Sequence, residues 1–109
     1  MYRLIISVAL VCYAVAAEAR VGMEKQDRYE GNALMAGACQ DTDHLKFLEG
    51  VYNVCEATEA QWESMYEKFK EGQEEFQQGR VDPATCGVVR DVLANGRELQ
   101  STFGGNVCQ

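Results

Sequence analysis

The chain has 109 residues, a formal net charge of −7 at pH 7, one proline and one histidine. This acidic balance argues against nucleic acid and anionic membrane surfaces as partners, because both attract basic patches. It is compatible with a basic protein partner or with solubility alone. The length suits one small domain. The core of such a domain is thin, so covalent cross-links matter to its stability.

The first 19 residues have the pattern of a secretory signal peptide. Arg3 supplies a positive charge, residues 4–17 are almost all apolar, and Ala17-Glu18-Ala19 offers small residues at both positions of a cleavage site. The apolar run is shorter than the ~20 residues that a membrane-spanning helix needs. We therefore expect residues 1–19 to be cleaved and residues 20–109 to be secreted as a single soluble domain without a membrane span.

Loss of this segment removes Cys12 and leaves four cysteines: Cys39, Cys55, Cys86 and Cys108. An even cysteine count behind a signal peptide is typical of a disulfide framework. The chain contains no C-x-x-C pair, and the cysteine spacing is too wide for a zinc knuckle. We therefore predict structural disulfides, no metal site and no cofactor.

Apolar spacing predicts an all-α fold, a small disulfide-linked bundle of three to four helices. The segment 20–38 predicts a poor helix, or a helix plus a loop that leads to Cys39, because Gly31 and Gly37 weaken any helix there. The segment 42–57 predicts a helix capped by Asp41 or Thr42. Its apolar residues at three- and four-residue spacing are Leu45, Leu48, Val51, Tyr52 and Cys55.

Two further helices have clear boundaries. Thr58 and Gln61 match the capping-box pattern and begin a helix over 59–78, which Gly79 is placed to end. Asp82-Pro83 begins a helix that runs to about residue 99. The apolar face predicted for this last helix comprises Cys86, Val88, Val89, Val92, Leu93 and Leu99.

Helix geometry favours one of the three possible disulfide pairings. Short links make the last three helices antiparallel neighbours, which brings Cys39 toward Cys86 and Cys55 toward Cys108. Cys55 and Cys86 lie at opposite ends of a helix of ~20 residues, roughly 30 Å apart, too far to bond. We therefore predict Cys39–Cys86 and Cys55–Cys108. The pairing of Cys39 with Cys55 would mean that the antiparallel bundle is wrong.

His44 is the one candidate for a catalytic base. A hydrolase would need a nucleophile and an orienting carboxylate around it. Asp43 points about 100° away from His44 on a helical wheel, and no serine or free cysteine lies in a nucleophile-elbow context. We interpret His44 as a solvated side chain and predict no catalytic residue.

Two sets of side chains are candidates for binding. An acidic row on the 59–78 helix suggests a docking face for a basic partner, although a solvated face is the simpler interpretation. Its members are Glu59, Glu63, Glu67, Glu71, Glu74 and Glu75, partly offset through the pairs Lys70–Glu74 and Lys68–Glu71. An aromatic and methionine set suggests a pocket for a small apolar ligand, although ordinary core is the simpler interpretation. Its members are Phe47, Tyr52, Trp62, Met65, Tyr66 and Phe69, with Phe76 beside them.

By elimination, we expect a non-enzymatic secreted effector that binds an extracellular protein target. Toxins and salivary or reproductive-fluid factors are of this kind. A carrier of a small hydrophobic ligand is the alternative. A small secreted hydrolase that uses His44 is a weaker alternative.

Overall fold

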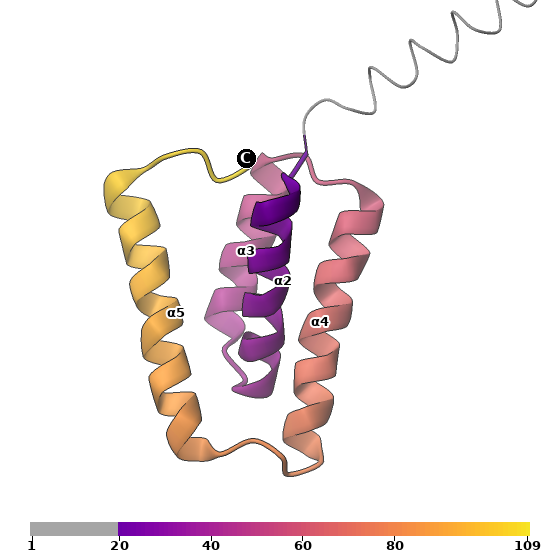
Figure 1. Cartoon of the computed structure of the whole chain (residues 1–109), viewed down its shortest axis with the longest axis vertical. Coiled ribbons are helices and arrows are strands. Elements are labelled where there is room, and N and C mark those ends of the chain that lie inside the picture. Colours follow the sequence, from indigo (N-terminus) through magenta and orange to yellow (C-terminus); the bar gives the residue numbers. More distant parts are fainter. Residues whose placement is uncertain (1–19) are drawn as a thin grey trace, which may run out of the picture.

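The computed structural model describes residues 20–109, so the predicted signal peptide lies outside the described residues. This part of the chain consists of four helices without strands: α2 (Met23–Ala38), α3 (Thr42–Val54), α4 (Glu59–Gln77) and α5 (Pro83–Phe103). The predicted all-α class is confirmed. Figure 1 shows α2 and α3 in the centre, flanked by α4 and α5, with the C-terminus near the start of α2. None of these helices is both long and apolar enough to cross a bilayer.

The helix boundaries follow the predicted capping residues. Thr58 Oγ1 accepts a hydrogen bond from the Gln61 backbone N–H at 3.1 Å, and Gln61 Oε1 accepts one from the Thr58 N–H at 3.1 Å. Asp82 Oδ1 accepts from the Ala84 N–H at 3.3 Å. Gly79 follows α4 with φ of 72°, the left-handed conformation that glycine adopts readily. The Thr58 and Asp82 side chains thereby satisfy first-turn N–H groups of α4 and α5 that have no partner within the helix.

Of the two forms predicted for the N-terminal segment, the poor helix is wrong, because α2 is continuous up to Ala38 and is the main packing partner of α4. Glycine explains both the error and the packing. A Cβ added at Gly37 would lie 2.0 Å from the Phe69 carbonyl oxygen, and one added at Gly72 would lie 2.1 Å from the Leu34 carbonyl oxygen. The two backbones approach too closely for any side chain at these positions. Gly37 therefore costs helix propensity but allows the contact between the helices.

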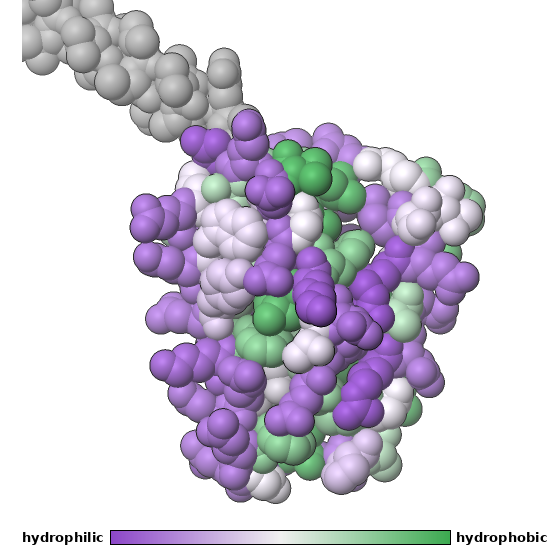
Figure 2. Space-filling view, turned by 180° about the vertical axis from the view of Figure 1, so that it is seen from behind, coloured by the Kyte–Doolittle hydropathy of each residue, from purple (hydrophilic) through white to green (hydrophobic). Residues whose placement is uncertain are grey.

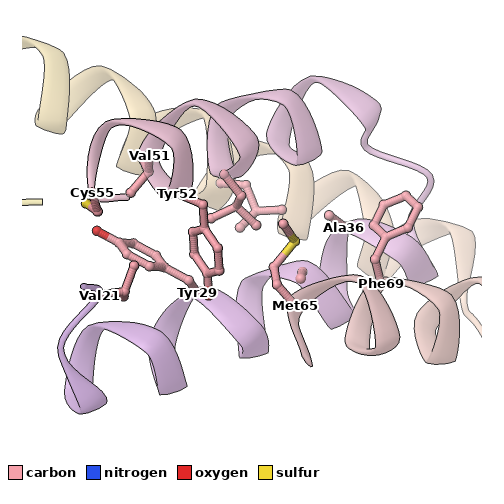
Figure 3. Close-up of a cluster of buried hydrophobic side chains, with 11 residues drawn as sticks. Val21, Tyr29, Ala36, Val51, Tyr52, Cys55, Met65 and Phe69 are labelled. Carbon is pink, nitrogen blue, oxygen red and sulfur yellow. The ribbon is translucent and has the colours of Figure 1, made fainter. Parts of the chain in front are cut away.

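The core lies where α2, α3 and α4 meet (Figure 3). Leu48, Tyr52 and Met65 are the largest fully buried side chains. The Tyr52 ring lies edge-on to Trp62, with 5.6 Å between ring centroids, and 6.0 Å from Tyr29. These aromatic contacts join all three helices in one cluster.

Two disulfides attach α5 to this core. They join Cys39 to Cys86 and Cys55 to Cys108, as predicted from helix geometry. Cys86 lies in the first turn of α5 and Cys108 lies beyond its end. Each bond closes a long loop, with sequence separations of 47 and 53 residues, and such loops give disulfides a large stabilising effect on the fold.

The tail after α5 returns to the beginning of α2 through hydrogen bonds. The Gly22 N–H donates to the Cys108 carbonyl oxygen at 2.5 Å, and the Tyr29 hydroxyl donates to the Val107 carbonyl oxygen at 2.5 Å. The C-terminal Gln109 side chain donates to a backbone oxygen of Arg20 at 2.7 Å. The two ends of the described chain are therefore held together.

α5 buries little of its apolar face. Cys86 and Leu93 are its buried residues, and Val89 is half-buried. Only part of the predicted apolar face is covered, because its arc is wider than the narrow seam between α5 and its neighbours α2 and α3. The exposed members, with the additional Phe103, are Val88 at 64%, Val92 at 60%, Leu99 at 56% and Phe103 at 78% of full exposure.

Candidate functional site

The predicted acidic row lies on the outside of α4, where hydrophilic side chains follow the edge of the molecule (Figure 2). Glu75 is half-buried, and the remaining five glutamates are exposed. Lys68 Nζ lies 3.2 Å from Glu71 Oε2, as predicted, and Arg80 Nη1 lies 3.0 Å from Glu75 Oε1. The predicted Lys70–Glu74 pair is not among the salt bridges of residues 20–109.

A groove of about 720 Å³ adjoins the C-terminal half of this acidic row. It lies between the C-terminal parts of α2 and α4 and the beginning of α5. Its apolar lining consists of Leu34, Met35, Ala38, Val81, Val89 and the Cys39–Cys86 disulfide. Its charged lining consists of Glu71, Glu74, Glu75, Asp82 and Arg80. We call this feature the acidic groove.

Sequence reasoning missed the acidic groove because three helices contribute to it. Leu34 and Met35 belong to the segment that was predicted to form a poor helix. Both are about one-third exposed, at 36% and 37%. Their exposure follows from the close contact at Gly37, which fixes the rotation of α2 against α4. The acidic row was the one signal in the sequence that pointed to this region.

The side chains predicted to line an apolar pocket mainly fill the core instead. Tyr52, Met65 and Phe69 are buried in the core cluster, and Trp62 is half-buried against it. Burial raises the pKa of the Tyr52 hydroxyl, which has no hydrogen-bond partner among the described residues. None of these four side chains lines the acidic groove.

Phe47 and Tyr66, the other two members of this set, lie nearer the surface. Phe47 is half-buried, and its ring lies 5.4 Å from that of His44. Tyr66 is 41% exposed, and its hydroxyl donates a hydrogen bond to Glu49. Partial burial, and then this bond, raise the pKa of Tyr66 to about 12.

His44 is buried, with 2% of its surface exposed, so the prediction of a solvated side chain is wrong. The cause is α5, which passes the beginning of α3. Arg97 Nη1 lies 2.8 Å from His44 Nδ1 and 3.7 Å from Asp41 Oδ2. Asp41 Oδ1 also accepts the His44 backbone N–H at 3.1 Å. Two helices that are distant in the sequence create this cluster, so the pattern around His44 could not reveal it.

The cluster fixes the proton arrangement on the imidazole. A guanidinium group only donates hydrogen bonds, so Nδ1 accepts from Arg97 and the neutral ring carries its proton on Nε2. Burial, and then the Arg97 charge, lower the pKa of His44 below its ordinary value, while Asp41 acts in the opposite direction. A serine-hydrolase triad places a carboxylate at this ring nitrogen. With Arg97 in that position, the geometry gives no support to the hydrolase alternative.

The chain can also be compared with known proteins. No protein-family model matches it, and no curated protein or solved structure shows significant similarity to it. Within residues 20–109, no group of three or more histidine, cysteine, aspartate or glutamate side chains is arranged to hold a metal ion. The surfaces described above are therefore the features that bear on function.

Proposed function

We propose that this protein is a secreted, non-enzymatic effector that binds a protein target outside the cell. We further propose that the acidic groove receives a basic segment of the target that carries an apolar anchor residue. The observation that supports this is the groove itself, where carboxylates and apolar side chains line one hollow of about 720 Å³. Carboxylates attract and orient a basic partner, and a buried apolar anchor supplies much of the affinity of an interface.

The charges of the groove favour a basic occupant. Glu71 is paired with Lys68, and Glu75 is paired with Arg80. Asp82 accepts hydrogen bonds from the first turn of α5. Glu74 takes part in none of the salt bridges of the described residues. Its carboxylate is therefore available to a lysine or arginine of a partner without breaking an existing pair.

Two features support the extracellular part of the proposal. The N-terminal segment has the pattern of a signal peptide, and the remaining four cysteines form two disulfides. Disulfides persist in oxidising compartments and are rare in the cytosol. Intact-mass analysis of the secreted protein tests this directly. A chain that begins at Arg20 and lacks four hydrogens is expected, whereas retention of residues 1–19 or free thiols would contradict it.

A peptide titration tests the groove. The probe is a fluorescent amphipathic lysine–leucine peptide, with a glutamate–leucine peptide of the same length as the chemical control. Glu71→Lys with Glu74→Lys is expected to weaken binding of the basic peptide about tenfold, mainly through the association rate and most clearly at low salt. Glu63→Lys with Glu67→Lys is the matched control, because it makes the same charge change on α4 outside the groove.

The control pair should weaken binding by less than about threefold, through long-range charge alone. Equal losses from both pairs would show that net charge, and not the groove, governs binding. Equal binding of the acidic peptide would contradict the proposal outright. A photocrosslinking residue at Met35 then identifies the natural target in the secretion, provided that the purified target binds the wild type and not the Glu71→Lys, Glu74→Lys variant.

A carrier of a small hydrophobic ligand is the second candidate, because the volume of the groove lies in the range of small-molecule sites. Native mass spectrometry of the protein from its natural secretion separates the two. Additional mass that leaves on denaturation would favour the carrier, and a bare polypeptide mass would favour the effector.

A further inference from the structure

A second cleft lies on the other part of the α5 seam, between α2, α3 and α5, and has a volume of about 230 Å³. We call it the His44 cleft. Its polar lining includes Lys25, Arg28, Asn32 and His44, and its apolar lining includes Phe47 and Leu93. We propose that this cleft binds a small organic anion with an apolar body, such as a short-chain carboxylate or phosphate ester. This site shares no lining residue with the acidic groove, so the inference is independent of the proposed function.

His44 carries a hydrogen-bond donor without a partner among the described residues. His44 is 2% exposed and lines the cleft. Arg97 engages Nδ1, which assigns the ring proton to Nε2. Nε2 is buried and has no hydrogen-bond partner among residues 20–109. Buried polar groups in proteins are nearly always paired, and an unpaired one requires an explanation. His44 lines the cleft, and an anionic oxygen that enters it would become the acceptor of this N–H once the side chains covering Nε2 shift slightly.

Positive side chains border the cleft on its α2 side. Lys25 and Arg28 lie one helical turn apart on the same side of α2, and neither takes part in a salt bridge within the described chain. Asn32 lies one further turn along and adds an amide donor. No aspartate or glutamate lines the cleft. In a chain with a net charge of −7, this local excess of positive charge and donors favours an anion over a cation.

The remaining wall of the cleft is largely apolar. The Phe47 ring and the buried Leu93 side chain face the cleft from α3 and α5. These two side chains cannot hydrogen-bond, so a small hydrated ion would gain nothing from contact with them. A ligand with one anionic end and a short apolar chain can pair with the positive side chains and pack against Phe47 and Leu93. The volume of about 230 Å³ suits a small organic acid.

NMR titration of the intact secreted protein tests the site. Hexanoate is the probe, with hexylamine and 1-hexanol as controls of equal chain length. His44 is the single histidine of the chain, so its ring nitrogen signals are unambiguous. Hexanoate is expected to shift the Nε2 signal and the Asn32 and Leu93 amides in a saturable way. Hexylamine and hexanol should leave these signals unchanged at the same concentrations.

A matched pair of variants tests the positive charges. Lys25→Gln with Arg28→Gln should weaken hexanoate binding about tenfold, since each exposed ion pair contributes modestly. Lys46→Gln with Lys70→Gln makes the same change of net charge outside the cleft and should have less than a twofold effect. These positions are on the surface, so the test does not depend on altering the buried His44.

Several outcomes would overturn the inference. No saturable shift at His44 with hexanoate would do so, as would equal binding of hexylamine or equal losses from the two variant pairs. Hexyl phosphate and inorganic phosphate then sharpen the ligand class. Tighter binding of hexyl phosphate than of inorganic phosphate supports the role of the apolar wall, and equal binding of the two would contradict it.

Discussion

The contact between α2 and α4 differs in kind from the contact between α5 and the rest of the molecule. α2 and α4 meet backbone to backbone at Gly37 and Gly72 and enclose Met65 and Phe69 nearby. α5 buries little besides Cys86 and Leu93. Two disulfides hold it near both ends. Close packing stabilises the first contact, and covalent bonds hold the second.

This difference explains where the candidate sites lie. A close-packed interface leaves no space for a ligand, whereas a helix held at its ends leaves hollows along its seam. The acidic groove and the His44 cleft both border α5. Their linings have opposite charge, which follows from the α4 glutamates at one and the α2 cations at the other. A disulfide framework thus lets a small domain keep open surfaces without a large core.

Reduction of both disulfides should have the largest effect and should act mainly on α5. Each bond closes a loop of about 50 residues, worth about 4 kcal/mol of stability by chain entropy. Denaturant unfolding of the oxidised and reduced protein measures the total. Hydrogen exchange should show that α5 loses protection first while α2 and α4 retain more. Equal loss in all four helices would show that the two contacts are a single cooperative unit.

Glycine substitutions should weaken the α2–α4 contact and leave the attachment of α5 largely unchanged. Gly37→Ala and Gly72→Ala each place a methyl group about 2 Å from a carbonyl oxygen, and we expect each to lower the free energy of unfolding by about 3 kcal/mol. Gly31→Ala and Gly96→Ala are matched controls, because a Cβ at either position meets nothing within 4 Å. Each control should instead stabilise its helix by about 0.5–1 kcal/mol. Similar losses at all four sites would contradict the close contact.

The sequence was sufficient where local chemistry decides structure. Thr58, Gln61 and Asp82 determine helix starts through hydrogen bonds to neighbouring residues, and periodicity determines the class. The disulfide pairing also followed, because helix length and antiparallel order restrict which cysteines can meet.

The sequence was insufficient where distant segments meet. Gly37 costs propensity within its own helix, and only the position of Gly72 shows its value. His44 resembles a solvated first-turn residue until α5 brings Arg97 to it. Val88 and Leu99 have the helical spacing of buried residues, yet both are exposed. The reason is that α4 packs against α2 and leaves α5 with few neighbours to cover it. The candidate sites inherit this difficulty, since each draws its lining from three helices.

Acidification should weaken the α5 seam through His44. Its pKa in the folded state is lowered, so the unfolded chain binds a proton at higher pH than the folded chain does. Stability is therefore complete above the ordinary histidine pKa of about 6.5 and falls as the pH drops below it, by up to ~1.4 kcal/mol per pH unit. Unfolding midpoints between pH 7.5 and 5.5 measure this, in a window above the main carboxylate titrations.

Three cations and one carboxylate surround the His44 ring: Arg97 on α5, Lys25 and Arg28 on α2, and Asp41 before α3. Protonation of His44 therefore adds a positive charge to a mainly positive surrounding. His44→Gln should remove most of the slope in this window. An equally steep slope in that variant would assign the effect to other groups. Hydrogen exchange at pH 5.5 should show loss of protection in α5 before α2.

The smallest expected effects come from the helix caps at Gln61 and Asp82, which compare the packed α2–α4 contact with the disulfide-held α5. Gln61 completes the α4 cap and also donates to the Val21 carbonyl oxygen at 2.8 Å and to Gln26 at 2.7 Å, so Gln61→Ala removes a cap and a connection to α2. We expect a loss of about 1–2 kcal/mol. Asp82 caps α5 at the exposed surface, and Asp82→Ala should cost only about 0.5–1 kcal/mol. Thermal unfolding of the two variants ranks them. A larger loss from Asp82→Ala would mean that the beginning of α5 depends on its cap rather than on the nearby Cys39–Cys86 bond. That result would contradict the view that a disulfide, and not local interactions, holds this end of α5.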